Sequence, residues 1–198
     1  MDEQTIEVYN RSHSRFVLEW MPRTPVKIRE LVLKYFNPGS KVLDIGSGSG
    51  RDTNWLLQRG FNAEGVDASH GLLKEARSRY PAAVFRFDAL PHLSMTETSA
   101  YDHALCSAVL MHVPASQVTF AMEHTLRVIR PGGYLICSVR SSRQTEDREE
   151  DGRLFTHLTL DDLARCVAGV HAQVLESIEE TVEGTQRTWR TIVCRKLS

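Results

Sequence analysis

The stretch Val42-Leu43-Asp44-Ile45-Gly46-Ser47-Gly48-Ser49-Gly50 decides how this chain folds. It begins as a short apolar run and ends in glycines, and residues 51–60 after it have the apolar spacing of a helix. This order predicts a strand, a tight loop and a helix. Glycines suit such a loop because, without Cβ atoms, they turn tightly and let a ligand approach the backbone beside the N-terminal amides of the helix.

The alternation of strands and helices continues along the chain. Further strands are predicted at 61–67, 84–87, 101–110 and 133–139. Between them, one helix is capped by Ser69 and ends before Pro81. Another begins at Pro114 and carries an apolar face that extends to Ile129. Strands separated by helices indicate a parallel sheet that is covered on both faces.

The C-terminal part changes character. Thr159 and Asp162 resemble a capping box and predict the start of a helix. The last two predicted strands, 172–182 and 187–196, are joined by only four residues, 183–186. Strands this close in sequence are expected to pair as an antiparallel hairpin at the edge of the sheet.

Residues 141–153 form a long polar, acid-rich segment without periodicity. A loop of this length is often a lid over a site, whereas solvated surface is the default for a charged run such as 146–153. We therefore assign no ligand to this segment. The first 37 residues have helical spacing, and we expect them to cover one face of the sheet, with a ligand as a second possible contact.

The composition is that of an ordinary globular domain. The chain has 198 residues, of which 41% are hydrophobic and 25% charged, and its formal net charge is −1. These values exclude collagen-like, disordered and disulfide-miniprotein classes. Basic and acidic residues are interspersed, so nucleic acid is not an expected partner. We expect one domain, 1–198, made of an N-terminal helical cap at 1–37 and a core at 38–198.

Cysteine spacing and the N-terminal segment bear on location. Cys106, Cys137, Cys166 and Cys194 each lie in or beside an apolar segment, and their separations match no zinc or redox motif. We therefore expect the four cysteines to be buried and reduced, as in a reducing compartment. The first residues do not resemble a signal peptide, and no apolar run approaches a membrane span. We therefore expect a cytoplasmic protein that does not bind a membrane. We also expect no metal site, since no histidine pair has HExxH spacing.

Asp67 is the second residue that points to a ligand. It lies 17 residues after Gly50, at the carboxyl end of the second predicted strand. A carboxylate at this place can accept hydrogen bonds from both hydroxyls of a ribose. By itself an aspartate after a strand is more often a helix cap or a turn former, so the inference depends on its order and spacing relative to the glycines.

With these residues in place, the sequence resembles the class I S-adenosylmethionine-dependent methyltransferases from about residue 40 to the C-terminus. The acidic and glycine-rich signature is 44–50, the ribose acid is Asp67, and an adenine-side acid is Asp88 in the segment FDALP. The strand-four segment 101–114 and the turn 130–133 match as well. The resemblance implies an α/β fold: a Rossmann-like, seven-stranded, mostly parallel sheet with helices on both faces and an antiparallel C-terminal hairpin.

The resemblance also implies which residues contact the cofactor. It assigns Asp44, Gly46, Ser47 and Gly48 to the methionine end of S-adenosylmethionine, Asp67 and Ala68 to the ribose, Asp88, Ala89 and Leu90 to the adenine, and Ser107, Ala108 and Val109 to the floor. Two alternatives stay open. Asp44 can instead bond to loop amides, and Asp88 can instead cap its own loop.

Methyl transfer from a sulfonium is an in-line displacement that needs mostly positioning and exclusion of water. A general base matters only where the acceptor starts protonated. His112, just after strand four, is the candidate base or substrate contact, and the alternative is a capping or packing role. Tyr9, Arg15, Trp20 and Trp189 are further candidates to reach the acceptor, although aromatic residues more often belong to a core.

The predicted function is therefore methyl transfer from S-adenosylmethionine to a small-molecule acceptor, releasing S-adenosylhomocysteine. One alternative is a non-catalytic partner subunit or sensor that binds these molecules. The second is an NAD(P)-dependent oxidoreductase, which uses a similar crevice. Against the latter, the glycines run G-x-G-x-G, and Arg51 stands where the last glycine of the dinucleotide fingerprint would fall.

Overall fold

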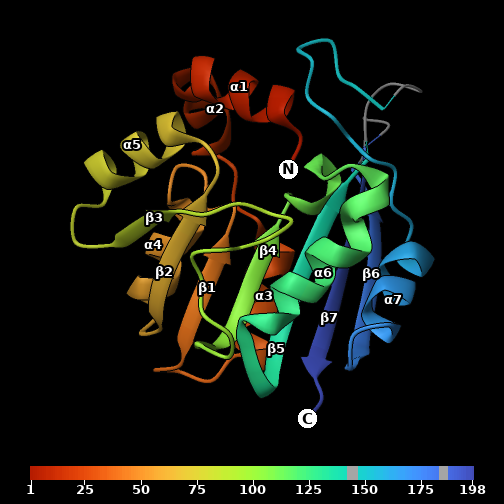
Figure 1. The fold of residues 1–198 in the computed structure, drawn as a ribbon. Coiled ribbons are helices and arrows are strands. Elements are labelled where there is room, and N and C mark those ends of the chain that lie inside the picture. The colour runs from red at the N-terminus through yellow and green to blue at the C-terminus, as the bar shows by residue number, and fades with distance from the viewer. Residues whose placement is uncertain (142–146, 183–186) are drawn as a thin grey trace.

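The computed structural model describes residues 1–141, 147–182 and 187–198, and its centre is a seven-stranded sheet (Figure 1). The strands are β1 (Lys41–Ile45), β2 (Asn62–Asp67), β3 (Val84–Phe87), β4 (Tyr101–Ser107), β5 (Ile129–Arg140), β6 (Ala172–Thr181) and β7 (Thr188–Lys196). Their order is β3-β2-β1-β4-β5-β7-β6, and β7 runs antiparallel to both of its neighbours. The predicted fold class, including the antiparallel hairpin at the edge, is confirmed.

Helices cover both faces of this sheet. They are α1 (Glu3–Arg11), α2 (His13–Trp20), α3 (Val26–Tyr35), α4 (Arg51–Gln58), α5 (His70–Arg79), α6 (Val118–Arg127) and α7 (Leu160–Ala168). Helices α3 and α4 lie behind the sheet in Figure 1, and α6 and α7 lie in front of it. Helix α5 packs Leu73 and Ala76 against Phe85 of β3.

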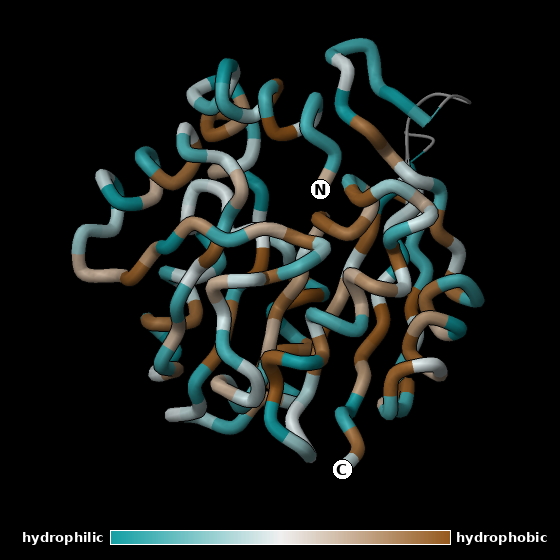
Figure 2. The backbone as a smooth tube through the Cα atoms, in the orientation of Figure 1, coloured by the Kyte–Doolittle hydropathy of each residue, from teal (hydrophilic) through white to brown (hydrophobic). Residues whose placement is uncertain are grey.

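Two apolar layers hold the sheet between the helices. Leu43 and Ile45 of β1 pack with α6 and α7, whereas Val42 points the other way and packs with α3 and α4. The alternation follows from the period of two along a strand. Figure 2 shows the hydrophobic colour concentrated in the central strands. Both faces of the central parallel strands β1 and β4 are thus largely buried, as a sheet of this kind requires.

The predicted caps and hairpin agree with the structure. The Ser69 side chain accepts a hydrogen bond from the Leu72 amide, and Thr159 and Asp162 form a complete capping box at α7. Strands β6 and β7 pair from Ala172 with Lys196 onward. The expected turn at 183–186 lies outside the described residues.

The end of β4 differs from the prediction of a strand at 101–110. The strand ends at Ser107, because Ala108 adopts a positive φ of 60° that an extended strand does not allow. Residues Leu110–His112 and Ala115–Gln117 then form short 3-10 turns, and α6 begins at Val118 rather than at Pro114.

The start of β5 also differs. Ile129 opens this strand instead of closing the helix face, so the strand begins four residues before the predicted 133. The predicted turn at 130–133 lies within the strand as an irregularity, where Gly132 has a positive φ of 81°. A Cβ on Gly133 would lie 2.0 Å from the carbonyl oxygen of Asp102, so only glycine fits this approach to β4.

The N-terminal helices do not act as one cap over a face of the sheet. Only α3 does so, because it buries Ile28, Leu31 and Val32 against the strands. Helices α1 and α2 lie over the carboxyl ends of the strands, at the top of Figure 1. The expectation of a single sheet-covering cap is therefore wrong for α1 and α2.

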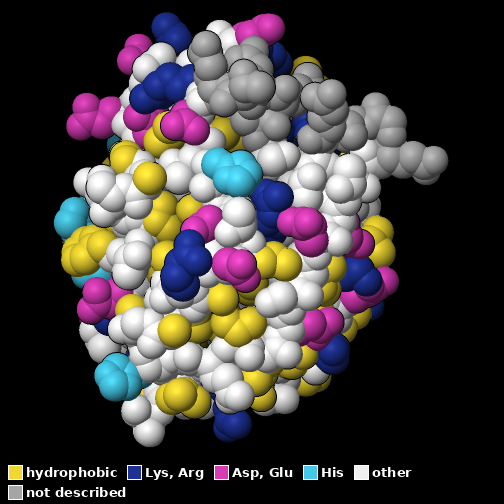
Figure 3. All heavy atoms as spheres, turned by 90° about the vertical axis from the view of Figure 1, so that its right-hand side faces the viewer, with side chains coloured by type: hydrophobic (Ala, Val, Ile, Leu, Met, Phe, Trp, Pro, Cys, Tyr) yellow, Lys and Arg dark blue, Asp and Glu magenta, His cyan; other side chains and the backbone are white. Residues whose placement is uncertain are grey.

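All four cysteines are buried and none forms a disulfide, which confirms the prediction of buried thiols. The reducing compartment stays a prediction. Figure 3 shows acidic and basic side chains interspersed on the face that carries β6 and α7. Among the described residues, no helix has both the length and the apolar character of a membrane span.

The core position of Leu43 gives a test of this packing. Leu43 is fully buried in β1, and Leu43→Ala is expected to lower the free energy of unfolding by about 2–5 kcal/mol, through lost transfer energy and a residual cavity. Leu18→Ala is the matched control because its side chain is 75% exposed, and it is expected to change stability by less than about 0.5 kcal/mol. Urea denaturation of both variants measures the difference, and equal losses would contradict the assigned core.

Candidate functional site

A cavity of about 630 Å³ opens at the carboxyl ends of the parallel strands. Its size is typical of small-molecule sites. Helices α1 and α2 contribute Tyr9 and Trp20 to its wall. Of the residues named from sequence for the cofactor and the reaction, those that line it are Gly46, Ser47, Gly48, Asp67, Ala68, Asp88, Ala89, Leu90, Ser107, Ala108, Val109 and His112. Asp44 does not line it.

The glycine loop after β1 is held tightly against its neighbours. The amides of Gly46 and Ser47 both donate to the carbonyl of Val66 at the end of β2, at 2.8 and 2.9 Å. Gly46 has a positive φ of 69°, and a Cβ there would lie 2.3 Å from Cγ2 of Val109. The loop can therefore approach Val109, just after β4, only with glycine at this position. Ser47 Oγ is buried against Gly65 of β2, where a Cβ on Gly65 would lie 2.8 Å from it, and it makes no hydrogen bond to any described residue.

Asp67 joins the end of β2 to this loop. Its Oδ2 accepts from the amide of Gly48 and its Oδ1 from the amide of Ser69, both at 2.8 Å. Burial raises the pKa of Asp67, while these amide bonds act in the opposite direction. Each carboxylate oxygen can accept a further hydrogen bond, so Asp67 retains acceptor capacity toward the cavity that it lines.

Asp44 lies beneath the loop rather than in the wall of the cavity. It is buried, and its Oδ2 accepts from the hydroxyl of Thr53 on α4 at 2.6 Å. Burial raises the pKa of Asp44 to about 7, and the charge of Asp52 adds to the effect. The Thr53 hydroxyl is neither of the two partners that the sequence predicted for Asp44, which were the methionine end of the cofactor and the loop amides. The Thr53 contact requires the fold, because it joins residues from two elements.

The Asp88 carboxylate holds its own loop. Its Oδ1 accepts from the amide of Ala89 at 2.9 Å, and its Oδ2 accepts from the Thr96 hydroxyl at 2.6 Å and the Met95 amide at 3.2 Å. This is the capping arrangement that the sequence left open. Asp88 also lines the cavity, so its contact with an adenine stays a prediction.

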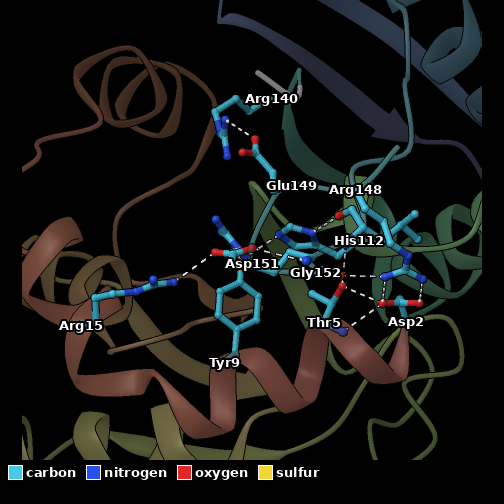
Figure 4. Close-up of polar contacts among 12 residues, drawn as sticks. Asp2, Thr5, Tyr9, Arg15, His112, Arg140, Arg148, Glu149, Asp151 and Gly152 are labelled. Atoms are coloured by element: carbon cyan, nitrogen blue, oxygen red, sulfur yellow. Dashed lines mark hydrogen bonds and ion pairs between the residues drawn. The ribbon is translucent and has the colours of Figure 1, made fainter. Parts of the chain in front are cut away.

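His112 connects to the N-terminal helix through Tyr9 (Figure 4). Its Nδ1 lies 2.6 Å from the carbonyl oxygen of Leu154, which can only accept, so Nδ1 carries the proton. Its Nε2 lies 2.8 Å from the Tyr9 hydroxyl, which therefore donates to it. Burial lowers the pKa of His112 to about 4, and the nearby Arg153 and Arg140 contribute in the same direction.

The charged segment 147–153 is not a solvated run. Arg148 pairs with Asp2 at 2.8 Å, Glu149 with Arg140 at 3.6 Å, and Asp151 with both Arg15 and Arg153 at 3.0 Å (Figure 4). These pairs fix the segment over α1 and the end of β5, and solvated surface is the wrong expectation for the four residues that form them. Glu146 lies outside the described residues.

The structure also sorts the residues named for the acceptor. Tyr9, Trp20 and Trp189 line the cavity, whereas Arg15 faces Asp151 instead. The lining residues that the sequence did not indicate include Phe155 and two arginines, Arg140 and Arg153. No periodicity or motif marks Arg153 and Phe155, because they lie in an irregular segment whose position is set by distant ion pairs.

Comparison with known proteins gives one family. Residues 17–183 match the family model described as "Methyltransferase domain". A Xanthomonas oryzae pv. oryzae protein named ubiquinone biosynthesis O-methyltransferase is 27% identical over 118 residues, which cover 58% of this chain and 48% of that protein. The chain spans about half the length of the curated relatives it matches.

Two solved structures have a similar fold. The first is a Burkholderia thailandensis 1,6-didemethyltoxoflavin-N1-methyltransferase with bound 1,6-didemethyltoxoflavin and S-adenosylhomocysteine (TM-score 0.81, 21% identity, 98% of this chain and 88% of that one). The second is the magnesium protoporphyrin IX methyltransferase of Synechocystis with bound S-adenosylmethionine (TM-score 0.73, 18% identity, 99% and 98%). At these identities the likeness concerns the fold.

The neutral state of His112 predicts a pH dependence of stability. Its folded pKa of about 4 lies below the ordinary 6.5, so the unfolded chain binds a proton between these values that the folded protein does not. Stability therefore falls as the pH drops from 6.5 to 4. We expect His112→Gln to lose less stability than the parent chain between pH 7.5 and 4.5, by roughly 3 kcal/mol.

Urea denaturation at both pH values measures this difference. His103, whose pKa burial likewise lowers to about 4, is present in both proteins and cancels in the comparison. Equal losses in the two proteins would show that His112 is not held neutral.

Proposed function

This chain belongs to the class I S-adenosylmethionine-dependent methyltransferase family, and from that premise we propose that it transfers a methyl group from S-adenosylmethionine to a small-molecule acceptor. The observation that carries the proposal is the junction of the glycine loop with Asp67. There, the amides of Gly48 and Ser69 hold the half-buried Asp67 carboxylate at one wall of the cavity.

The residues at this junction fit the cofactor. Asp67 lines the cavity and has acceptor capacity for ribose hydroxyls beyond the two amide bonds that hold it. Glycine at position 46 lets the loop lie close to Val109, because a Cβ there would clash with the Val109 side chain. We assign Gly46, Ser47 and Gly48 to the methionine end. The cofactor, when bound, supplies an electrophilic methyl group on a sulfonium.

Asp44 needs a revised role in this proposal. Its carboxylate bonds to Thr53 under the glycine loop and does not reach the cavity wall, so we assign it to holding that loop on α4. The remaining cofactor assignments stay as the family resemblance implies, and all of these residues line the cavity. They are Ala68 beside the ribose, Asp88, Ala89 and Leu90 beside the adenine, and Ser107, Ala108 and Val109 beneath.

Tyr9 and His112 support an acceptor whose nucleophile starts protonated. The neutral His112 directs its Nε2 lone pair at the Tyr9 hydroxyl, which lines the cavity. As the acceptor O–H or N–H proton passes to the Tyr9 oxygen, the phenol proton can pass to Nε2. The carbonyl of Leu154 then stabilises the resulting imidazolium through Nδ1–H. In this arrangement Tyr9 contacts the acceptor, and His112 acts through Tyr9.

A small acceptor agrees with the enclosure of the site by the chain's own helices. Trp20 and Tyr9 from α2 and α1 wall the cavity together with Phe155 and Trp189. The named relatives fit this class, since 1,6-didemethyltoxoflavin is a small molecule bound by one of them. We place the protein in the cytoplasm, on the basis of four free, buried thiols.

Cofactor binding is the first test. Isothermal titration with S-adenosylhomocysteine is expected to give a micromolar Kd, and Asp67→Ala should weaken binding by about 1–3 kcal/mol through loss of charged hydrogen bonds. Asp161→Ala, at an exposed position of α7, is the matched control and should bind as the parent chain does. Binding of NADH without S-adenosylhomocysteine would instead support an oxidoreductase. Binding of S-adenosylhomocysteine with no turnover of any acceptor would support a sensor.

The Tyr9–His112 pair gives a kinetic prediction. Tyr9→Phe keeps the ring that packs on Phe16 and Trp20 and removes only the hydroxyl. With the first phenol or amine that turns over in a screen, we expect kcat to fall about 10²-fold or more, while S-adenosylhomocysteine affinity stays unchanged. His112→Gln should lose activity similarly and flatten the acid limb of the pH–rate profile. An unchanged kcat in both variants would remove this pair from the mechanism.

A further inference from the structure

Two arginines flank one aromatic ring at the end of the cavity next to Tyr9 and His112. The guanidinium carbon of Arg140 lies 4.5 Å from the Phe155 ring centroid, and that of Arg153 lies 5.3 Å from it. Both side chains line the cavity, and both are nearly buried, with 11% and 13% exposed. Their charges act on the same groups, because both lower the pKa of His112. The two cations are therefore neighbours in one wall.

Two carboxylates that pair with these cations in the described part of the chain lie outside that wall. Glu149 pairs with Arg140 at 3.6 Å and Asp151 with Arg153 at 3.0 Å, but neither acid lines the main cavity. Two acids that do line it are Glu180 of β6, which is exposed and lies two strands from Arg140 in register, and Glu19 of α2, which borders a second pocket with Arg153 and is paired with Arg23 at 3.0 Å. This end of the cavity thus presents positive charge inward.

Arg153 shows what the wall can still bind. Its Nε donates to Asp151 and its Nη1 to the Tyr9 hydroxyl at 3.2 Å, while its Nη2 makes no hydrogen bond within the described part of the chain. A guanidinium is a planar fork whose geometry matches an oxyanion in bidentate contact. The Arg153 guanidinium carbon lies 4.7–5.5 Å from the ring centroids of Tyr9, Phe16 and Phe155, which restrict its movement. Little side-chain entropy remains to be lost on binding.

From this arrangement, and resting on the proposed function above, we propose that the methyl acceptor is a ring-bearing small molecule with an oxyanionic substituent, bound by Arg140 and Arg153. Rings suit the same end, because Trp20, Phe155 and Trp189 line it. Since Arg153 also contacts the Tyr9 hydroxyl, an anion on this arginine brings the rest of the ring close to the proton-accepting atom. The substituent therefore positions the acceptor and does not itself react.

The proposal predicts the sign of the effect that a change at Glu149 has on the binding of an anionic ligand. Glu149 is the internal carboxylate on Arg140, with only 12% of its side chain exposed, and a ligand anion must share or replace it. Removing its charge should therefore strengthen the binding of an anionic ligand. A merely structural role of the pair predicts the opposite, because breaking a buried ion pair loosens the wall.

The test uses the full chain saturated with S-adenosylhomocysteine and measures ligand binding by isothermal titration. The probes are matched aryl compounds: dihydroxybenzoates, hydroxyphenyl phosphates and the neutral dihydroxybenzamides. We expect at least one anionic series to bind ten-fold or more tightly than its amide counterpart. Arg140→Gln should reduce this preference to two-fold or less, and Glu149→Gln should increase it. Arg11→Gln is the control, because Arg11 is exposed on α1 and does not line the cavity.

Each outcome decides the question. Tighter carboxylate binding identifies a carboxylated acceptor, and tighter phosphate binding identifies a phosphorylated one. Equal binding of anionic and neutral probes, no binding of any anion, or a preference that survives in Arg140→Gln overturns the anionic acceptor while the cofactor still binds. Failure of S-adenosylhomocysteine to bind at all is a separate result and overturns the proposed function instead. The double variant R140Q/E149Q, which leaves no stranded charge, repeats the test if Arg140→Gln does not fold.

Discussion

The contact between the glycine loop and the end of β2 is the constraint on which the site depends. The amides of Gly46 and Ser47 bond to Val66, and Asp67 bonds back to Gly48, so the first two parallel strands are joined at their carboxyl ends by a reciprocal set of hydrogen bonds. The close approach of Gly46 to Val109 adds the segment after β4 to the same junction. The ends of two strands and the segment after a third thus meet beside the cavity. A Cβ at position 46 would clash with Val109 and disturb this junction.

A second set of contacts closes that cavity from above, and it comes from distant parts of the chain. Tyr9 of α1, His112 after β4 and Leu154 in the irregular segment form one chain of hydrogen bonds. His112 is buried between the half-buried Tyr9 and Leu154, and its two contacts fix the imidazole in one tautomer. The same contacts that hold the segment in place therefore also set the protonation state of a group in the site.

How much could be read from the sequence depended on whether a residue's role was local. The glycine loop, Asp67, the Ser69 cap and the α7 capping box were predictable, because each follows from a motif within a few residues. Asp44 was assigned to the cavity, but its partner Thr53 lies on the next helix and turns it away. Arg153 was missed, because its position results from contacts with Tyr9 and Phe16, more than a hundred residues away in the chain, and Arg140 was missed because no motif marks the end of β5.

The ion pairs of the 147–153 segment position this segment more than they stabilise the fold. Arg148 with Asp2 and Arg15 with Asp151 are partly exposed, and such pairs contribute little net free energy. Arg140 with Glu149 is nearly buried, where desolvation offsets much of the attraction. An apolar segment would cover the cavity at lower cost in desolvation. Paired charges, unlike apolar contacts, fix one register of the segment and leave guanidinium groups in the wall of the site.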